Sequence, residues 1–536
     1  MKRIVYLLFF MAAATTAVGQ NDWVVSPSGH RIRISCGEYN AFVTQQDSAI
    51  TGHVVLPDSA SYWEYYFEPD ADWPYDSVLH TVPVTVVEDY AFAHCRSLTG
   101  ITIPATVTHI GYGAFSYCTA LDSMAVLPGN SAYATPQGCN AYIDTRENEL
   151  ICGCRRSTIP PTVTSIASRA FQGIEELAAI VLPDSLEVIG NYAFDGCTAL
   201  RSFHIPAKVR SVGYMCLAHC RGLTSLTVDP DNAVFDSRGD CNAVVNTANN
   251  WLVAGCAATV IPDDVRRIDQ KAFVGFDSLH QLTLPNSIVE ICDFAFQDCT
   301  GLRSIHIPAS VLYIGHNPFA GCTSLDTITV DSANTKYDSR SSCNAIYDKN
   351  NGQIVSGCRS TVIPNNTYRI APYAFYGIAG LHRIVLPKKV ISIGEEAFAG
   401  CTGVSTIISA DEIAPQVSWG SFDGIDPDIA VHIRRGSLAS YTERWSYFHN
   451  FVEDFPVGID ETTEGERNYS LVCRDGMLCI YAATPLPVRI FDISGKELYH
   501  CSPVATATLR LTDILPASHS ILLVQVGNHP AEKIFY

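Results

Sequence analysis

Cysteine is the residue type whose spacing in this sequence points most directly to chemistry. The 536-residue chain holds 20 cysteines, and cysteines of exported proteins commonly form disulfides. Three pairs recur with a period of 102 residues and bracket predicted hairpins, namely Cys139–Cys154, Cys241–Cys256 and Cys343–Cys358. A hairpin centred on its turn would place both thiols of a pair opposite each other. Because bridging depends on geometry, each pair is either a disulfide or two buried thiols side by side.

A second series of cysteines follows the repeat of the chain rather than a pairing rule. These residues occupy one interior position of the repeat, where cysteine usually packs as a small buried hydrophobic residue. No metal site is predicted, because the chain has no Cys-x-x-Cys doublet and no histidine that recurs beside the cysteines. The series consists of Cys95, Cys118, Cys197, Cys220, Cys299, Cys322 and Cys401.

Arginine, histidine and threonine recur at positions predicted to face outward from strands. A basic strip with histidines on an acidic molecule would favour acidic protein or glycan partners. Many of its members lie 102 residues apart, so tandem duplication alone also explains them. The predicted ligand-binding residues are Arg201, His204, Thr227, His280, Thr283, Arg303, His306, His382 and Arg383.

The tripeptide Arg238–Gly239–Asp240 has the sequence that integrins recognise. It lies just before Cys241 in a predicted hairpin insertion, where it would be exposed. The equivalent positions 136–138 and 340–342 carry other residues, so the array itself does not require the motif. Glycine and aspartate also suit an ordinary turn, and both interpretations stay open.

No catalytic motif is present in the sequence. The nucleophile elbow, the His-Glu-x-x-His zinc motif, the phosphate loop and the dinucleotide fingerprint are all missing. The acidic stretch 229–232 is predicted to be a polar turn rather than a calcium loop, because the equivalent stretch 127–130 has no carboxylate. We therefore expect a binding protein without a cofactor. A hydrolase would need two convergent carboxylates or a catalytic triad in a pocket.

The elements that position these residues are set by an internal repeat. Its unit is Phe-x-x-Cys-x-x-Leu-x-x-Ile-x-Ile-Pro-x-x-Val-x-x-Ile-Gly, with one copy from Phe194 to Gly213. Three spacings of 23 residues alternate with one of 33, which gives a larger period of 102. This register predicts a tandem duplication of a four-turn block. The residues at the Leu position are Leu98, Leu121, Cys154, Leu177, Leu200, Leu223, Cys256, Leu279, Leu302, Leu325, Cys358, Leu381 and Val404.

The repeat predicts a mostly β solenoid with parallel strands. Isoleucines two residues apart lie on one face of a strand, and the proline that follows ends it. One such strand cannot close a core, so successive turns must stack. The ten extra residues of each long turn read as β-hairpins, with Asn-Asn turns at Asn249–Asn250 and Asn350–Asn351.

Changes in the pattern along the chain predict its domains. Residues 21–86 form an N-terminal cap with a first irregular repeat, and residues 87–428 form the repeat array. A strand and a short helix within 429–456 would close the last turn, and 457–467 is a polar linker. Short alternating strands with turn signals at Asp475–Gly476 and Ser494–Gly495 predict a small β-sandwich over 468–536.

Residues 1–20 read as a signal peptide. Lys2 and Arg3 precede an apolar run, and Ala17–Val18–Gly19 is a small-x-small cleavage site. No later stretch reaches the roughly 18 consecutive apolar residues of a membrane span. The formal charge is −19, which disfavours nucleic acid and anionic membranes as partners. We expect an exported protein that is secreted or displayed on the outer cell surface.

The turns with Ala-Phe and Gly-Cys pairs, such as Ala193–Phe194 with Gly196–Cys197, resemble those of BspA-type leucine-rich repeat surface proteins of Bacteroidetes. The Cys-Asn-Ala hairpins and the aromatic end of the array are similar to that family too. The resemblance spans about residues 35–455. It implies a leucine-rich repeat fold, display at the cell surface and, for several members, adhesion to host proteins or neighbouring cells.

The segment 487–496 is similar to the C-terminal sorting domains of type IX secretion. It departs from them at 518–521, where a Gly-x-Tyr would be usual. The resemblance implies that 468–536 is a sorting domain.

These observations together predict a surface adhesin for host or microbial proteins. A glycan-binding surface protein is the alternative, and it would favour exposed aromatic platforms over the Arg/His strip.

Overall fold

The computed structural model describes residues 21–37, 39–66, 76–409, 411–455, 469–474, 477–491, 497–510, 521–526 and 532–535. The chain divides into two compact units, Met1–Phe455 and Pro456–Tyr536. The predicted signal peptide, 1–20, and the predicted linker, 457–467, lie outside the described residues.

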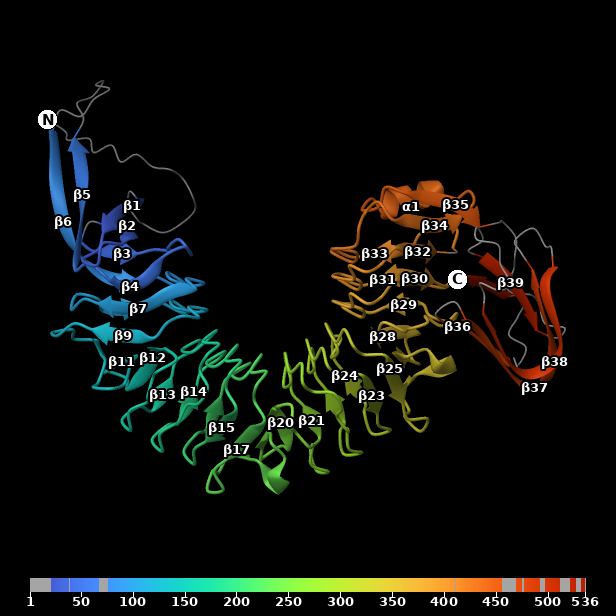
Figure 1. Ribbon diagram of the computed structural model, residues 1–536, viewed down its shortest axis with the longest axis horizontal. Coiled ribbons are helices and arrows are strands. Elements are labelled where there is room, and N and C mark those ends of the chain that lie inside the picture. Colours follow the sequence, from blue (N-terminus) through green and yellow to red (C-terminus); the bar gives the residue numbers. More distant parts are fainter. Residues whose placement is uncertain are drawn as a thin grey trace. The chain divides into compact units, whose positions relative to one another are not determined.

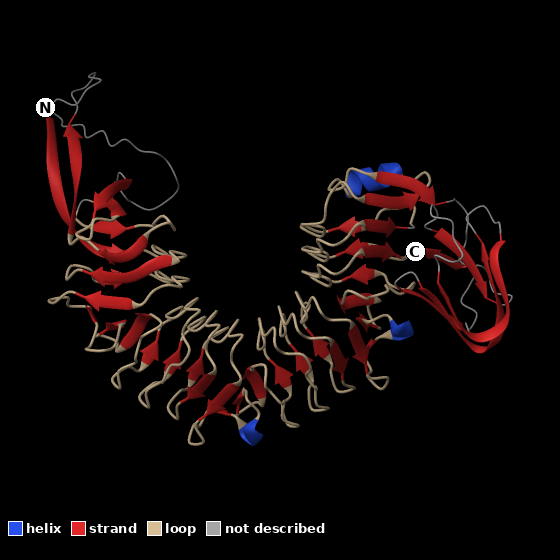
Figure 2. Ribbon diagram, viewed as in Figure 1, coloured by secondary structure: helices blue, strands red, loops and turns tan. Residues whose placement is uncertain are grey.

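The first unit is a solenoid of about 16 turns that stack on one another (Figures 1 and 2). In a typical turn, the strand β15 (Ser202–Ile205) ends at Pro206 and is followed by the two-residue strand β16 (Ser211–Val212). β15 pairs in parallel with β17 (Ser225–Val228), and each partner lies 23 residues further along the chain. The predicted mostly β solenoid is confirmed.

Three six-stranded sheets follow the three long turns. Each begins with an antiparallel hairpin and continues through parallel two-residue strands of the following short turns. The first consists of β10 (Tyr133–Ala134), β11 (Ala141–Asp144), β12 (Glu149–Gly153), β13 (Ser165–Ile166), β14 (Val188–Ile189) and β16. The second consists of β18 (Phe235–Asp236), β19 (Val244–Asn246), β20 (Trp251–Ala254), β21 (Arg267–Ile268), β22 (Glu290–Ile291) and β24 (Tyr313–Ile314). The third consists of β26 (Tyr337–Asp338), β27 (Ala345–Asp348), β28 (Gln353–Gly357), β29 (Arg369–Ile370), β31 (Ser392–Ile393) and β33 (Gln416–Val417). The 3-10 helices Arg238–Asp240 and Arg340–Ser342 lie in the second and third hairpin regions.

The longer strands of the Leu-x-x-Ile-x-Ile segment form a second, interrupted set of parallel sheets. No strand forms at 256–261 or 279–284, although both stretches carry the pattern. In the first of them the Val260 amide donates to the Cys241 carbonyl of the hairpin at 3.0 Å, so the hairpin takes a hydrogen bond that a sheet neighbour would use. A strand in every turn is therefore a wrong expectation. The sheets are β4 (Thr51–Val55), β7 (Ser97–Ile103) and β9 (Ser123–Val126); β15 and β17; β23 (Ser304–Ile307) and β25 (Thr327–Val330); and β30 (Arg383–Leu386), β32 (Thr406–Ser409), β34 (Ala430–Arg434) and β35 (Phe451–Phe455).

A β-bulge in each hairpin moves the predicted cysteine pairs out of register. Beyond the bulge of the first hairpin, Ala141 lies opposite Gly153. This one-residue shift sets Cys154 against Asn140, whose carbonyl accepts the Cys154 thiol at 3.4 Å, rather than against Cys139. The other two hairpins carry the same shift. In the structure Cys139, Cys154, Cys241, Cys256, Cys343 and Cys358 are free, buried thiols and not the disulfides that a centred hairpin would allow.

We expect these six cysteines to be free thiols in the folded protein, because the bulge denies them the alignment of a disulfide. Alkylation of the full chain in denaturant without reductant, followed by peptide mass mapping, should label all six. Prior reduction should leave the labelling unchanged. A peptide pair linked through Cys139 and Cys154 would contradict the geometry.

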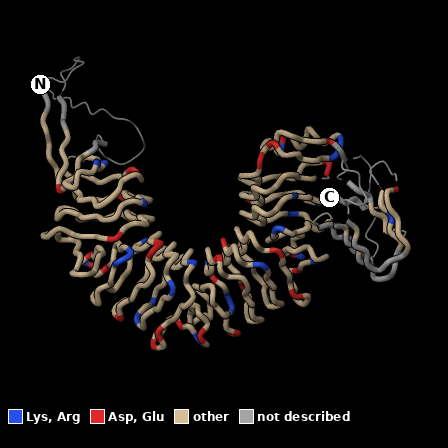
Figure 3. Tube along the Cα trace, viewed as in Figure 1, with Lys and Arg blue, Asp and Glu red and all other residues tan. Residues whose placement is uncertain are grey.

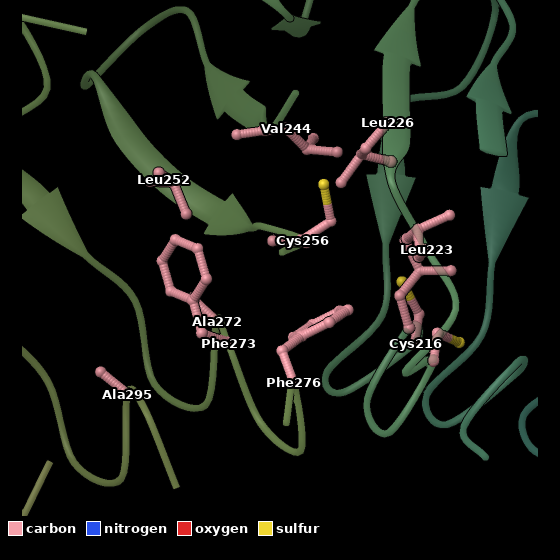
Figure 4. Close-up of a cluster of buried hydrophobic side chains, with 14 of the residues drawn as sticks. Cys216, Leu223, Leu226, Val244, Leu252, Cys256, Ala272, Phe273, Phe276 and Ala295 are labelled. Atoms are coloured by element: carbon pink, nitrogen blue, oxygen red, sulfur yellow. The ribbon is translucent and has the colours of Figure 1, made fainter. Parts of the chain in front are cut away.

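Phenylalanine rings stack from turn to turn in the core of the first unit. The ring of Phe273 lies beside Leu252 of the second hairpin, with Phe276 close by (Figure 4). Neighbouring turns supply these contacts, so no turn buries its ring alone. The ring centroids are 5.0 Å apart for Phe171–Phe194, 5.1 Å for Phe273–Phe296 and 4.9 Å for Phe375–Phe398.

The repeating cysteine series also joins the turns. All seven members are buried, and six donate their thiol to the carbonyl of a phenylalanine 26 residues earlier, as Cys299 does to Phe273 at 3.0 Å. Burial raises the pKa of Cys401 to about 12, so this thiol stays protonated and remains a donor. The series acts as buried hydrophobic residues, as the repeat predicts.

One asparagine in each block fastens the hairpin to an earlier short turn. The Nδ2 of Asn232 donates to the carbonyls of Pro206 at 2.8 Å and Val209 at 2.9 Å. Its Oδ1 accepts the amides of Val234 and Phe235, each at 2.9 Å. The predicted polar turn after β17 is thus built around a buried side-chain amide. Equivalent bonds are made by Asn130 and Asn334.

Both ends of the array are covered. At the N-terminal end a sheet contains β1 (Asn21–Val25), β2 (Arg31–Cys36), β3 (Ala41–Val43), β5 (Ser59–Tyr66), β6 (Asp76–Val87) and β8 (His109–Ile110). At the other end β34 is followed by α1 (Leu438–Arg444), as predicted. The side chains of Tyr441 in this helix and of Trp445 directly after it are buried.

The described residues of the second unit form one antiparallel sheet of five strands, where the sequence predicted a small β-sandwich. β37 pairs with β36 over its first half, with β39 over its second half and with β38 along most of its length. Register shifts near its middle separate the two halves. The strands are β36 (Tyr469–Arg474), β37 (Met477–Phe491), β38 (Glu497–Arg510), β39 (Ile521–Val526) and β40 (Glu532–Phe535).

Candidate functional site

The ligand-binding residues predicted on the outward faces of the strands form what we call the strand strip. Some of its polar groups bond to one another. His204 on β15 and Thr227 on β17 are exposed, and the His204 Nδ1 lies 3.0 Å from the Thr227 hydroxyl. The His204 Nε2 lies 3.9 Å from a carboxylate oxygen of Asp229. The same constellation recurs 102 residues later, with His306, Thr329 and Asp331. Sequence reasoning missed Asp229, Thr329 and Asp331, although the 102-residue period relates them.

The remaining strip residues do not continue this surface as one sheet. His280 and Thr283 are exposed on the stretch that forms no strand, and His280 lies 3.3 Å from the Gly301 carbonyl. His382 makes the equivalent contact with Gly403, while Arg383 is half-buried on β30. Arg201 and Arg303 are exposed. Basic and acidic residues are interleaved along the solenoid (Figure 3).

The guanidinium of the integrin-type tripeptide is held by the protein itself. Arg238 pairs with Asp236 at 2.8 Å and with Asp264, and it donates to the Asn250 side chain at 2.9 Å. Gly239 and Asp240 are exposed. Arg340 of the next block pairs with Asp338 in the same way although its tripeptide is Arg-Ser-Ser. Arg238 therefore has a structural partner set, and the structure does not present it freely beside Asp240.

A more continuous row of side chains lies along the turns that precede each Ala-Phe pair. We call this row the turn edge. It consists of Tyr90, Tyr112, Arg169, Tyr192, Tyr214, Lys271, Phe294 and Tyr373.

Neighbours along the turn edge are in contact across successive turns. The Arg169 guanidinium carbon lies 4.8 Å from the ring centroid of Tyr112 and 4.4 Å from that of Tyr192. Tyr192 and Tyr214 meet edge to face at 5.7 Å. Cation–π and edge-to-face contacts of this kind hold the rings in fixed orientations. The row continues through Lys271, 5.7 Å from both Tyr214 and Phe294, to Tyr373, 5.4 Å from Phe294.

Backbone geometry makes the residue types of the turn edge informative. Six of its members have φ between 54° and 65°, a left-handed conformation that bulky residues rarely adopt. Glycine takes this place at Gly113 and Gly420. A bulky side chain here costs about 1 kcal/mol of backbone strain, and Met215 and Glu396 occupy the equivalent place in other turns. The six are Tyr90, Arg169, Tyr192, Lys271, Phe294 and Tyr373.

Three tyrosines of the turn edge are held in the neutral form by burial. Burial raises the pKa of Tyr192, Tyr214 and Tyr373 above the usual tyrosine value, and the cationic members are Arg169 and Lys271. The sequence contained one indication of this row, the bulky residue that repeatedly precedes Ala-Phe, as in Tyr192–Ala193–Phe194.

A family comparison agrees with this architecture. The family model described as the BspA type leucine rich repeat region matches six copies over 78–135, 150–238, 255–348 and 355–421, which is more than half of the chain. The chain belongs to the BspA-type leucine-rich repeat family. No curated protein sequence matches the chain.

Solved structures of leucine-rich repeat proteins are similar to this BspA-type protein at low identity. A leucine-rich cell surface protein from Faecalibacterium prausnitzii is 20% identical, covering 83% of this chain and 96% of that one, with a TM-score of 0.29. A leucine-rich repeat protein from Bacteroides ovatus is 21% identical, with 79% and 98% covered and a TM-score of 0.30. The pneumococcal vaccine antigen PcpA is 13% identical, with 81% and 99% covered and a TM-score of 0.34.

Two further properties of the described residues bear on function. They contain no group of three His, Cys, Asp or Glu side chains placed to hold a metal ion. Of the helices in this part of the chain, none has the length and apolar character needed to cross a membrane.

Proposed function

We propose that this BspA-type protein is a surface-displayed or secreted binding protein whose partner is a protein of the host matrix or of a microbial surface. The observation that carries the proposal is the turn edge, a row of tyrosines with interleaved cations that crosses many turns. Tyrosine, tryptophan and arginine dominate the binding energy of protein interfaces. Rings already fixed by their neighbours lose little conformational freedom when a partner binds.

The strand strip is the weaker of the two candidate surfaces. Its two main histidines already bond to Thr227 and Thr329 and lie near aspartates. A partner would have to replace these bonds to gain any, and exposed polar pairs contribute little net energy. Arg238–Gly239–Asp240 is weaker still, because Arg238 is already paired.

A double substitution Tyr192→Ala with Tyr214→Ala is expected to weaken partner binding at least tenfold, because it removes two neighbouring rings from the middle of the turn edge. Binding of the full chain to immobilised fibronectin, fibrinogen, laminin and collagen, measured by surface plasmon resonance, checks this. The matched control His204→Ala with His306→Ala should stay within about twofold of the wild type. If the histidine variant lost affinity tenfold and the tyrosine variant kept the affinity of the wild type, the binding site would lie on the strand strip and not on the turn edge.

Export and surface display are part of the same proposal. The signal-peptide pattern at residues 1–20 supports export. The second unit is a separate compact β unit at the C-terminal end of the chain, and its sequence at 487–496 is similar to type IX sorting domains. Both features fit a chain that is carried to the outer surface.

Glycan binding is the alternative function. One local observation favours it, a small pocket with polar lining beside the first hairpin.

A further inference from the structure

A pocket of about 280 Å³ opens beside the first hairpin, at the turn edge. The hairpin contributes no Ala-Phe turn, so the turns on its two sides are joined directly, with the Tyr117 amide donating to the Gln172 carbonyl at 2.9 Å. Tyr112 and Arg169, which contact each other, line the pocket together with Glu149 and Ile151 of β12.

The lining of the pocket differs from the equivalent positions of the other two blocks, where the residues are larger or already bonded. Gly113 at its wall has no side chain, whereas the residues 102 and 204 positions later are Met215 and Asn317. Asn317 is fully buried and bonds to the Ser356 hydroxyl at 2.6 Å.

A second difference between the blocks lies in the paired strands β12 and β13. Glu149 and Ser165 in the first block correspond to Trp251 and Arg267 in the second. There the arginine stacks on the tryptophan at 4.1 Å from the ring centroid, which is a bulkier pair than the carboxylate and hydroxyl of the first block. The repeat therefore does not dictate which residues line the pocket.

The polar groups of the pocket are opposed in charge and incompletely bonded. The buried Nε of Arg169 has no hydrogen-bond partner, although its Nη1 donates to the Gln172 side chain at 2.6 Å. Glu149 accepts the Ser165 hydroxyl at 3.0 Å, and burial raises the pKa of its carboxyl. A buried donor without a partner is destabilising until a ligand supplies an acceptor.

The lining distinguishes between classes of ligand. A carboxylate would pair with Arg169 but be repelled by Glu149. An ammonium group would pair with Glu149 but be repelled by Arg169. A neutral ring that carries hydroxyls can donate to Glu149 and accept from Arg169 at once. Its apolar C–H face can also rest on the apolar lining, which includes Ile151 and Phe115.

We propose that this pocket binds one neutral sugar residue of a glycan, held by Glu149 and Arg169 and bordered by Tyr112. The volume suits a single sugar ring, below the range of drug-sized ligand pockets. The site shares Tyr112 and Arg169 with the turn edge, and Arg169 also stacks on Tyr192. Glu149 lies outside the turn edge, so substitutions at Glu149 test the sugar site separately from the protein-binding proposal.

Saturation-transfer NMR of the full chain with the methyl glycosides of glucose, galactose, mannose and N-acetylglucosamine tests the site. At least one glycoside should bind with a dissociation constant on the order of 1 mM, typical of a ligand this small. The double variant E149W/S165R copies the Trp251–Arg267 pair of the second block and fills the pocket. It should weaken binding at least tenfold.

The matched control W251E/R267S makes the reverse exchange at the second hairpin and should leave binding within twofold of the wild type. The variant E149Q keeps the shape of the site and should weaken binding about fivefold, which covers the case in which the filled variant does not fold. Three results would each overturn the site: no glycoside binding to the wild type, undiminished binding to a folded filled variant, or tighter binding of acetate or methylammonium than of every glycoside.

Discussion

Replacing Phe273 with alanine is expected to destabilise the array by about 3–5 kcal/mol. Its ring is fully buried, stacks on Phe296 and lies directly against Gly255, where an added Cβ would sit 2.1 Å from a ring carbon. The removal of such a ring leaves a cavity between the hairpin and the next turn, which rigid neighbours cannot close. Urea denaturation of the full chain, followed by tyrosine fluorescence and circular dichroism, checks the loss.

The matched control for this experiment is Val181→Ala. The Val181 side chain is 82% exposed on a turn of the same array, so its truncation should change the unfolding free energy by less than about 0.5 kcal/mol. Equal effects of the two substitutions would mean that the stacked rings do not hold the turns together.

Replacing Asn232 with alanine is expected to cost about 3 kcal/mol or more. The substitution removes two hydrogen bonds to carbonyls of the preceding turn and two from amides of the hairpin itself, and it leaves these buried carbonyls and amides without partners. Asn232→Asp keeps the acceptor oxygen and loses the two donors, so its effect should be intermediate in the same denaturation experiment. Asn286→Ala, at an exposed position, serves as the control. A loss below 1 kcal/mol for Asn232→Ala would show that these bonds are replaced by water.

Much of the fold can be predicted from the sequence, because the residues that recur in the repeat are the ones that pack in the core. A phenylalanine, a cysteine and a leucine that recur every 23 residues can be buried only if successive turns stack, and this holds for Phe273 and Cys299. The hairpins and the closing helix near Tyr441 follow from turn residues and from the end of the pattern. Amphipathic spacing contains this information before any coordinates are known.

Other features depend on geometry that spacing does not encode. A one-residue bulge determines whether Cys154 lies opposite Cys139 or Asn140, and the sequence of the hairpin does not predict a bulge. The partners of Arg238 lie up to 26 residues away, at Asp264. Their contact depends on how the following turn folds back onto the hairpin.

The turn edge and the sugar pocket were missed for a related reason. The positive φ of Tyr192 is invisible in sequence, because a bulky residue is not the usual choice for that conformation. The pocket arises from a comparison between blocks, in which Gly113 takes the place of Met215. Tandem duplication preserves the core positions and leaves the residues at the turns free to diverge, which is how one solenoid can carry different binding sites.

We propose that this BspA-type protein meets its protein partner through the turn edge. Hydroxyl-radical footprinting of the full chain with and without a bound matrix protein tests this proposal most directly, because tyrosine and histidine both react and both can be read by mass spectrometry. We expect binding to protect Tyr192, Tyr214 and Tyr373 from oxidation while His204 and His306 react as before. Protection of the two histidines with unchanged labelling of the three tyrosines would contradict it.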